Sequence, residues 1–151
     1  MPQIIIEIFI DAPPATCLGL VRDERVIAEG SFPSGNDIKS AAPHRTVELG
    51  QIVTFRGKHL GFRQILTVKV VELEHGRRFV DKMIEGRFRA FRHTHEFVDV
   101  GGKTLMRDIL NWTSPFGILG RVADKTFIER HLRKFVIGRN LRLRAIAESV
   151  D

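Results

Sequence analysis

Residues 88–113, which read FRAFRHTHEFVDVGGKTLMRDILNWT, are the part of this chain that decides its fold class. Two runs, Phe88 to Val100 and Leu105 to Thr113, contain several β-branched and aromatic residues and are bounded by turn signals, which is typical of β-strands. Gly101-Gly102 separates the two runs and can adopt the positive φ angles of a tight hairpin turn. The stretch therefore predicts two neighbouring antiparallel strands.

Further strands are predicted on the N-terminal side of this hairpin. The runs 52–59, 63–73 and 78–84 are rich in β-branched and aromatic residues and are separated by short glycine-containing breaks. Residues 3–10, rich in Ile and Phe, predict the first strand. Because short turns join the successive strands after residue 51, we expect an antiparallel meander and not a parallel sheet with helical crossovers.

The segment between the first and second predicted strands carries helix and loop signals. Asp11 or a near neighbour can cap a helix and proline is tolerated in a first helical turn, so we expect one or two short helices within 14–28. Glycine and proline residues indicate a loop over 30–45, with a helical turn at 36–42.

About thirty residues after Ser114-Pro115-Phe116 contain no further proline and predict a C-terminal helix of roughly 45 Å. Its apolar stripe consists of Ile128, Leu132, Phe135, Val136, Leu143, Ile146 and Ala147. Leu119, Ala123 and Phe127 fall on another face, so we expect a bend or a change of contact partner near residue 127. The predicted fold is α+β: one domain over 1–151, with a sheet of six or seven strands and a long C-terminal helix.

Composition limits the class of protein. The chain has 151 residues, 43% of them hydrophobic, which is enough to bury a core. A single cysteine, Cys17, excludes an internal disulfide framework and is expected to pack in the core. No apolar run approaches the ~18 residues of a membrane span, and the start MPQIIIEIFI has no features of a signal peptide. We therefore expect a cytoplasmic protein without integral membrane association.

The positive charge is concentrated near the C-terminus. The formal net charge is +6, and residues 117–149 hold eight basic and three acidic residues, or +5. This surplus predicts either a solvated helix face or a weak contact with an anionic surface. No helix-turn-helix pattern, zinc-finger spacing or aromatic-rich basic strand is present, so no nucleic-acid partner is predicted.

Strand alternation predicts which side chains face the interior. Phe91, His93, His95 and Phe97 share one face of their strand, and the two bracketing phenylalanines indicate that this face points inward. The same reasoning places Phe55, His59, Phe79, Asp81, Met106, Asp108 and Trp112 inward on the other strands. On the helix, Arg139 falls inside the apolar stripe that contains Phe135.

Six ionisable residues are thus predicted to face the interior: His59, Asp81, His93, His95, Asp108 and Arg139. Buried charges destabilise a fold unless they are paired. Three interpretations remain open: a structural network such as Asp108 with Arg139, the polar end of an apolar pocket, or a metal site formed by His93, His95 and an aspartate. No third metal ligand can be placed from spacing, so neither a metal nor another cofactor is predicted.

Four stretches and one helical step carry a resemblance to a known family: VTFRGKHLGFRQILT (53–67), GRRFVDKMIEGRFRAFRHTHEF (76–97), GGKTLMRD (101–108), SPFGILGRVAD (114–124) and Arg139-Asn140. With the order of elements, they resemble the helix-grip fold of the SRPBCC superfamily (START-like and pollen-allergen-like proteins), in its bacterial ligand-binding or polyketide cyclase-like branch. The resemblance implies a curved sheet around the long helix, with a cavity between them. Its implied lining is Phe55, Phe79, Phe91, Phe97, Met106, Trp112, Phe135 and Val136.

Two functions follow as expectations. The first is binding of a small hydrophobic or amphipathic molecule, lipid-like or polyketide-like, whose polar group is held by Arg139 or a histidine. The alternative is a cyclase or dehydratase in which His93 or His95 is the general base, Arg139 holds an enolate oxygen and Asp108 orients the other groups. A third interpretation is an interaction protein that uses the basic helix or the segment 22–45 as its partner surface.

Overall fold

The structure is a computed structural model, and it describes residues 2–23, 37–40, 46–59, 62–86, 88–114, 117–123 and 127–149. Within these ranges, the side chains of 37–40, 55–59, 62–64, 120, 121 and 123 are not described.

Seven antiparallel strands form one sheet in the order β1-β7-β6-β5-β4-β3-β2. The strands are β1 (Gln3–Ile10), β2 (Asp37–Ser40), β3 (Ile52–His59), β4 (Phe62–Glu74), β5 (Arg78–Glu85), β6 (Ala90–Val100) and β7 (Lys103–Thr113). From β2 to β7 each strand pairs with the next, so the predicted meander is confirmed. The first strand pairs with the last, which places β1 at one edge of the sheet.

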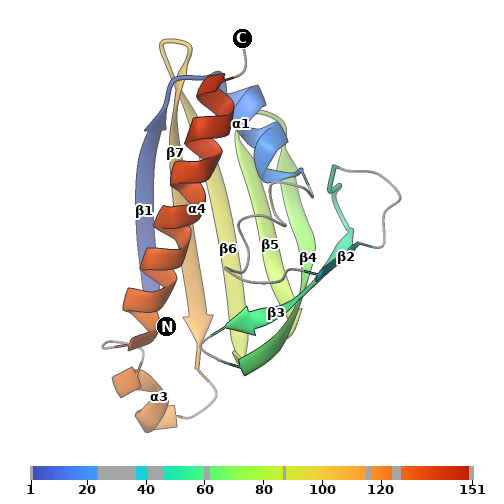
Figure 1. The fold of residues 1–151 in the computed structure, drawn as a ribbon, viewed down its shortest axis with the longest axis vertical. Coiled ribbons are helices and arrows are strands. Elements are labelled where there is room, and N and C mark those ends of the chain that lie inside the picture. The colour runs from blue at the N-terminus through green and yellow to red at the C-terminus, as the bar shows by residue number, and fades with distance from the viewer. Residues whose placement is uncertain are drawn as a thin grey trace.

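Three helices accompany the sheet: α1 (Pro14–Val21), α3 (Gly117–Ala123) and α4 (Glu129–Ser149). α4 crosses one face of the curved sheet, with α1 beside its C-terminal half, whereas α3 lies at the opposite end of the molecule (Figure 1). The predicted α+β class, with a curved antiparallel sheet, a C-terminal helix and a short helix after the first strand, is confirmed. None of the described helices combines the length and the hydropathy needed to cross a bilayer.

The long C-terminal helix is shorter than the roughly 45 Å predicted. α3 and α4 are separate helices, and α4 has 21 residues, or roughly 32 Å. α3 ends at Ala123 and α4 begins at Glu129, on either side of residue 127, where a bend or a change of contact partner was expected. Leu119 and Phe127 are 79% and 55% exposed, so this segment does not continue the buried stripe of α4.

Two other local predictions are corrected. Residues 37–40 form a strand and not a helical turn, because the outer edge of β3 offers unpaired backbone groups and β2 pairs with it. Asp11 does not cap α1; the N-cap is Pro13, and the backbone N–H of Asp11 donates to Glu148 instead (3.0 Å). Most of the expected loop lies outside the described residues.

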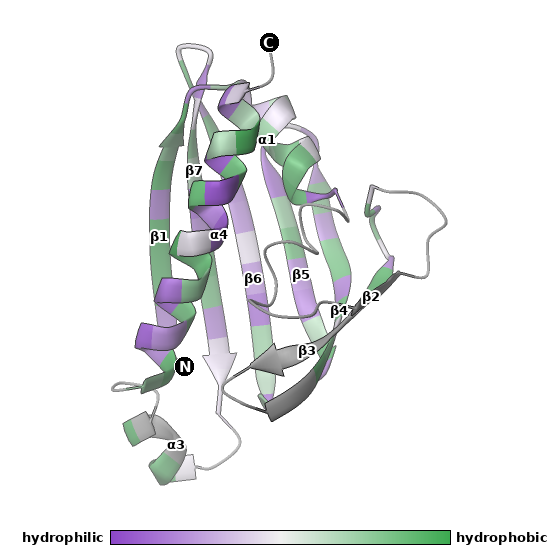
Figure 2. Ribbon diagram, viewed as in Figure 1, coloured by the Kyte–Doolittle hydropathy of each residue, from purple (hydrophilic) through white to green (hydrophobic). Residues whose placement is uncertain are grey.

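The core consists of two apolar clusters along the face covered by α4. We call the first the α1-end cluster; it includes Ile10, Cys17, Leu18, Val53, Val70, Phe79, Phe97, Met106, Leu143 and Ala147. The second, the α3-end cluster, contains Ile4, Ile6, Leu110, Trp112 and Val136. Strands alternate between hydrophobic and hydrophilic residues across the sheet (Figure 2), which is why one face can supply both clusters. The buried Cys17 confirms the expected core position of that side chain.

Candidate functional site

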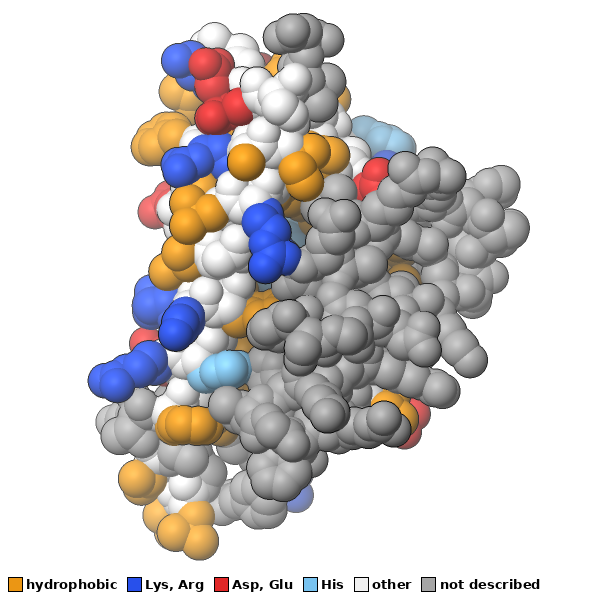
Figure 3. Space-filling view, viewed as in Figure 1, with side chains coloured by type: hydrophobic (Ala, Val, Ile, Leu, Met, Phe, Trp, Pro, Cys, Tyr) orange, Lys and Arg blue, Asp and Glu red, His pale blue; other side chains and the backbone are white. Residues whose placement is uncertain are grey.

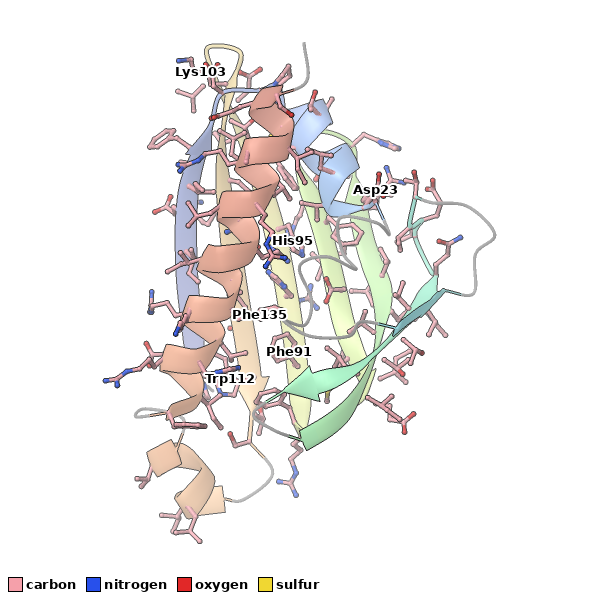
Figure 4. The ribbon with its side chains drawn as sticks, in the orientation of Figure 1. Asp23, Phe91, His95, Lys103, Trp112 and Phe135 are labelled. Atoms are coloured by element: carbon pink, nitrogen blue, oxygen red, sulfur yellow. The ribbon has the colours of Figure 1, made fainter. Side chains whose placement is uncertain are left out.

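A layer of polar side chains separates the two apolar clusters. Register places His95 opposite Asp108 on β7, and His93 opposite Asp81 on β5. Arg139 and Asn140 reach this layer from α4, between Val136 of one cluster and Leu143 of the other. We call Asp81, His93, His95, Asp108, Arg139 and Asn140 the polar layer. Figure 4 shows His95 beside the middle of α4, with Phe91, Trp112 and Phe135 nearer to α3.

Asp108 is the centre of the polar layer and is fully buried. Its Oδ1 is 2.7 Å from Nε2 of His93 and accepts a hydrogen bond from Nη2 of Arg139 at 2.8 Å. Its Oδ2 accepts from Nδ2 of Asn140 at 2.6 Å. Nδ1 of His95 lies 3.0 Å from Oδ1, without the alignment of a hydrogen bond. One carboxylate therefore holds two strands and the helix together.

The second carboxylate of the layer belongs to Asp81. Its Oδ2 lies 3.4 Å from Nε2 of His95, so that histidine has a carboxylate near each ring nitrogen. The rings of His93 and His95 stack at a centroid distance of 3.8 Å and an angle of 28°. The ring of Phe79 covers His95 from the next strand, with centroids 5.4 Å apart. The apolar and polar parts of the interior are thus in direct contact.

Burial and neighbouring charges separate the pKa values of the two histidines. Burial and the charge of His95 lower the pKa of His93 to about 4, although Asp108 favours the protonated ring. Burial also acts to lower the pKa of His95, but the carboxylates of Asp108 and Asp81 outweigh it and raise the value. The two stacked imidazoles therefore have pKa values shifted in opposite directions, and His95 is the easier of the two to protonate.

The charges in the layer compensate one another. Burial acts to raise the pKa of Asp108, but the charge of Arg139, the hydrogen bond with His93 and the nearby ring of His95 hold it well below its usual range. The carboxylate of Asp108 thus faces the guanidinium of Arg139, and His95, whose pKa is raised, lies between the carboxylates of Asp108 and Asp81. The predicted Asp108–Arg139 pair is present, with the Arg139 side chain 16% exposed. Such pairing reduces the cost of burying ions.

The layer also contains donors of the kind that bind metal ions. Asp81, His93 and His95 each present one ligand atom, and these atoms lie within 4.8 Å of one another. Two features oppose a metal ion at this position. The stacked rings hold their in-plane lone pairs in two nearly parallel planes, so the rings would have to rotate for both lone pairs to meet at one ion. The guanidinium of Arg139 also places a positive charge against the same network.

The structure divides the predicted lining residues into three groups. Phe79, Phe97 and Met106 are buried in the α1-end cluster, and Trp112 in the α3-end cluster. Phe91 and Phe135 are partly buried and pack against the α3-end cluster. Phe55 and His59 belong to β3, and their side chains lie outside the described part of the chain.

One residue of the layer, Asn140, was not among the predicted site residues. It is 1% exposed and donates the shortest hydrogen bond to Asp108. A sequence signal for it exists, because Asn140 lies four residues after Val136 and three before Leu143, inside the buried stripe of α4. A polar residue at such a position needs a buried partner, which Asp108 supplies.

A separate groove of about 440 Å³ lies near the β4–β5 turn. Its lining is mostly charged, with Glu74, Arg77, Arg78, Glu96 and Asp99 as the charged members. It is therefore not the apolar space expected between the sheet and α4, and that cavity stays a prediction.

Solved structures with the same arrangement of elements match nearly the whole length of this chain. The protein TTHA0849 from Thermus thermophilus superposes with a TM-score of 0.76 at 18% identity, over 98% of this chain and 99% of that one. The Zhui aromatase/cyclase from Streptomyces sp. R1128 superposes with a TM-score of 0.77 at 12% identity, over 97% and 93%. The chain has the helix-grip fold. Major latex-like protein 151 of Panax ginseng has the same fold, with a TM-score of 0.73 at 11% identity over 97% of both chains.

The superpositions establish the helix-grip fold, but identities of 11–18% do not establish a function. No model of a protein family matches the sequence, and a sequence search of curated proteins finds no relative. The function must therefore be argued from the polar layer of this helix-grip chain itself.

Proposed function

We propose that the protein binds a small hydrophobic or amphipathic molecule between the sheet and α4, and that the polar layer holds the polar group of that ligand. The observation that carries this proposal is a donor-rich polar layer enclosed by apolar clusters on both sides. Apolar walls with a few converging polar groups are the usual composition of small-molecule sites.

Arg139 is the residue best suited to hold the ligand. Its Nη2 donates to both Asp108 and Asn140, whereas its Nε is buried and has no acceptor among the described residues. A buried guanidinium N–H gains from an oxygen acceptor, and a carboxylate or carbonyl oxygen is the acceptor that an amphipathic ligand provides. The ligand class proposed here is therefore lipid-like or polyketide-like and carries such an oxygen.

The apolar part of the ligand would lie against the partly buried aromatic residues. Phe91 and Phe135 pack on the α3-end cluster without being fully enclosed, and they come from β6 and α4 on the two sides of the proposed site. Contact with these rings would supply most of the affinity, because apolar burial is the main favourable term in such binding.

Binding can be tested with paired probes of equal apolar size. Octanoate, palmitate and 2-naphthoate are measured by native mass spectrometry and thermal shift, beside the alcohols of the same carbon skeletons. Arg139→Gln removes the proposed anchor, and Arg142→Gln removes an exposed cation of the same helix as the matched control. We expect Arg139→Gln to weaken binding of the acids by about tenfold or more, with little change for the alcohols.

The alcohols also report whether the variant still folds around an apolar site. If neither acids nor alcohols bind the unmodified protein, the proposed function is wrong. If both arginine variants bind the acids equally, the ligand is held elsewhere.

One observation favours an enzymatic alternative, the cyclase or dehydratase. His93 is neutral and lies 2.7 Å from a fully buried carboxylate, as a general base with an orienting group would. If Nε2 of His93 donates to Asp108, Nδ1 keeps a lone pair that can take a proton from the carbon beside a carbonyl. The enolate oxygen would then be held by Arg139.

The alternative is tested by proton exchange. A β-keto thioester is incubated in deuterated buffer, and deuterium entry at the carbon between the carbonyls is followed by NMR. Acceleration over buffer that is lost in His93→Gln and kept in His75→Gln, an exposed control, would support the enzyme. Exchange no faster than in buffer would exclude this chemistry for that substrate class.

A further inference from the structure

We propose that α3, Phe127 and the first turns of α4 form a docking surface for an anionic lipid bilayer. This surface, which we call the α3 tip, consists of the apolar residues Ile118, Leu119, Val122 and Phe127 and the basic residues Arg130, Arg133 and Lys134. The inference does not depend on the ligand-binding proposal, because none of these side chains belongs to the polar layer.

The apolar residues of the α3 tip are unusually exposed. Ile118 and Leu119 are each 79% exposed, more than any other large hydrophobic side chain among the described residues, and Val122 and Phe127 are 62% and 55% exposed. All four fall within a short stretch of the chain, from Ile118 to Phe127. Figure 3 shows hydrophobic side chains of α3 gathered at the end of the molecule, below the basic side chains of α4. A contiguous exposed apolar patch is typical of an interaction site.

α3 is placed so that this patch can reach a flat surface. It follows the last strand, lies beyond the end of the sheet and makes little contact with the other described elements (Figure 1). Its exposed apolar side chains therefore do not lie at the edge of either core cluster. They project from one end of the fold, and a bilayer could bury them without a change in the sheet.

The positive charge near the α3 tip favours an anionic partner. Residues 117–134 hold five basic and two acidic residues, a surplus of +3, and Glu129 is paired with Arg133 at 3.2 Å. Arg130 and Lys134 lie on the turns that follow the apolar patch. Peripheral proteins that bind anionic membranes typically insert apolar side chains at the acyl boundary. Neighbouring cations then contact the lipid phosphates. A second copy of this chain would place like charges together, which opposes self-association through the same face.

Vesicle binding tests the inference directly. The full chain is sedimented with vesicles of phosphatidylcholine alone, or of phosphatidylcholine with about one third phosphatidylglycerol. Two double variants alter the tip: Ile118→Ser with Leu119→Ser, and Arg130→Glu with Lys134→Glu. Matched controls are Phe9→Ser with Ile84→Ser, which are exposed apolar residues of the sheet, and Lys103→Glu, an exposed cation at the start of β7.

We expect binding to the anionic vesicles only, weakened about tenfold or more by each tip variant and by high salt, and retained by the controls. Equal binding to neutral and anionic vesicles, no binding, or equal losses in tip and control variants would overturn the proposal. Sedimentation velocity of the protein alone tests whether the patch mediates self-association instead. A dimer that the serine tip variant abolishes, without vesicle binding by the unmodified chain, would assign the patch to a second copy instead.

Discussion

Nε2 of His93 lies 2.7 Å from Oδ1 of Asp108, and this contact is enclosed between two apolar clusters. Each group changes the protonation of the other, because the carboxylate favours a proton on the histidine while the donors of the layer keep Asp108 ionised. The polar layer therefore contributes to the stability of the fold and is also a candidate site. Its residues should differ in how their substitution and the pH change that stability.

The first prediction concerns the charge of Asp108. Asp108→Asn removes the buried counterion of Arg139 and places an amide donor among three existing donors. We expect a loss of about 3–5 kcal/mol in the free energy of unfolding, measured in urea. Glu7→Gln is the matched control, because Glu7 pairs with Arg107 on the exposed face of β1, and it should cost less than about 1 kcal/mol. Equal effects of the two variants would show that the layer does not depend on this ion pair.

The second prediction is an acid-side loss of stability that originates in His93. Its pKa falls from 6.5 to about 4 on folding, so between these pH values the unfolded chain holds a proton that the native state does not. Lowering the pH through this window therefore favours unfolding, by up to about 3 kcal/mol from this group. In His93→Gln the slope of stability against pH should decrease by about one proton, whereas His75→Gln should keep the slope of the unmodified chain. An unchanged slope in His93→Gln would contradict the prediction.

The third prediction has the opposite sign and concerns His95. Folding raises its pKa above 6.5, so its protonation stabilises the native state below pH 6.5, and that contribution is lost as the pH rises through the raised value. We therefore expect the destabilisation by His95→Gln, relative to the unmodified chain, to be largest below pH 6.5 and to decrease as the pH rises through the raised value. The measurement is the midpoint of urea unfolding over a pH series. A His95→Gln profile parallel to that of the unmodified chain would contradict a protonated His95.

The fourth prediction uses the single tryptophan. Trp112 is fully buried in the α3-end cluster, so its emission should be blue-shifted in the native state and move to the red on unfolding. Trp112→Ala should cost about 3–5 kcal/mol through the cavity it leaves. Phe127→Ala, at an exposed position, should change stability by less than about 1 kcal/mol. A small cost for Trp112→Ala would mean that this side chain lines open space and not core.

The fifth prediction contrasts two glycines. Gly102 has a φ of +88° in the β6–β7 turn, where a side chain is strained, so Gly102→Ala should destabilise by about 1–2 kcal/mol. Gly138 lies on the exposed side of α4, and a Cβ there would meet no heavy atom within 4 Å. Gly138→Ala should therefore stabilise by about 0.5–1 kcal/mol. Thermal unfolding of both variants checks the signs, and a destabilised Gly138→Ala would indicate a contact that this helix face makes in solution.

Local patterns predicted most of the fold because period and turn chemistry act over a few residues. Strand alternation around His93 and His95 correctly identified the inward face, and Gly101-Gly102 correctly identified the hairpin. The helical turn expected at 36–42 was wrong, because strand β2 forms only when the edge of β3 is available to it. Asn140 was missed because its role depends on a carboxylate thirty-two residues earlier in the chain.

The sequence by itself determined which side chains share a face of a strand or a helix, since backbone geometry sets those periods directly. It thereby placed two aspartates, two histidines and Arg139 inside one fold. Tertiary structure alone decided which atoms meet: that Asp108 accepts from α4 and β6 together, that the two histidines stack and separate in pKa, and that α3 leaves its apolar residues exposed. These outcomes depend on the register between strands and on the position of α4 over the sheet, which many distant contacts set jointly.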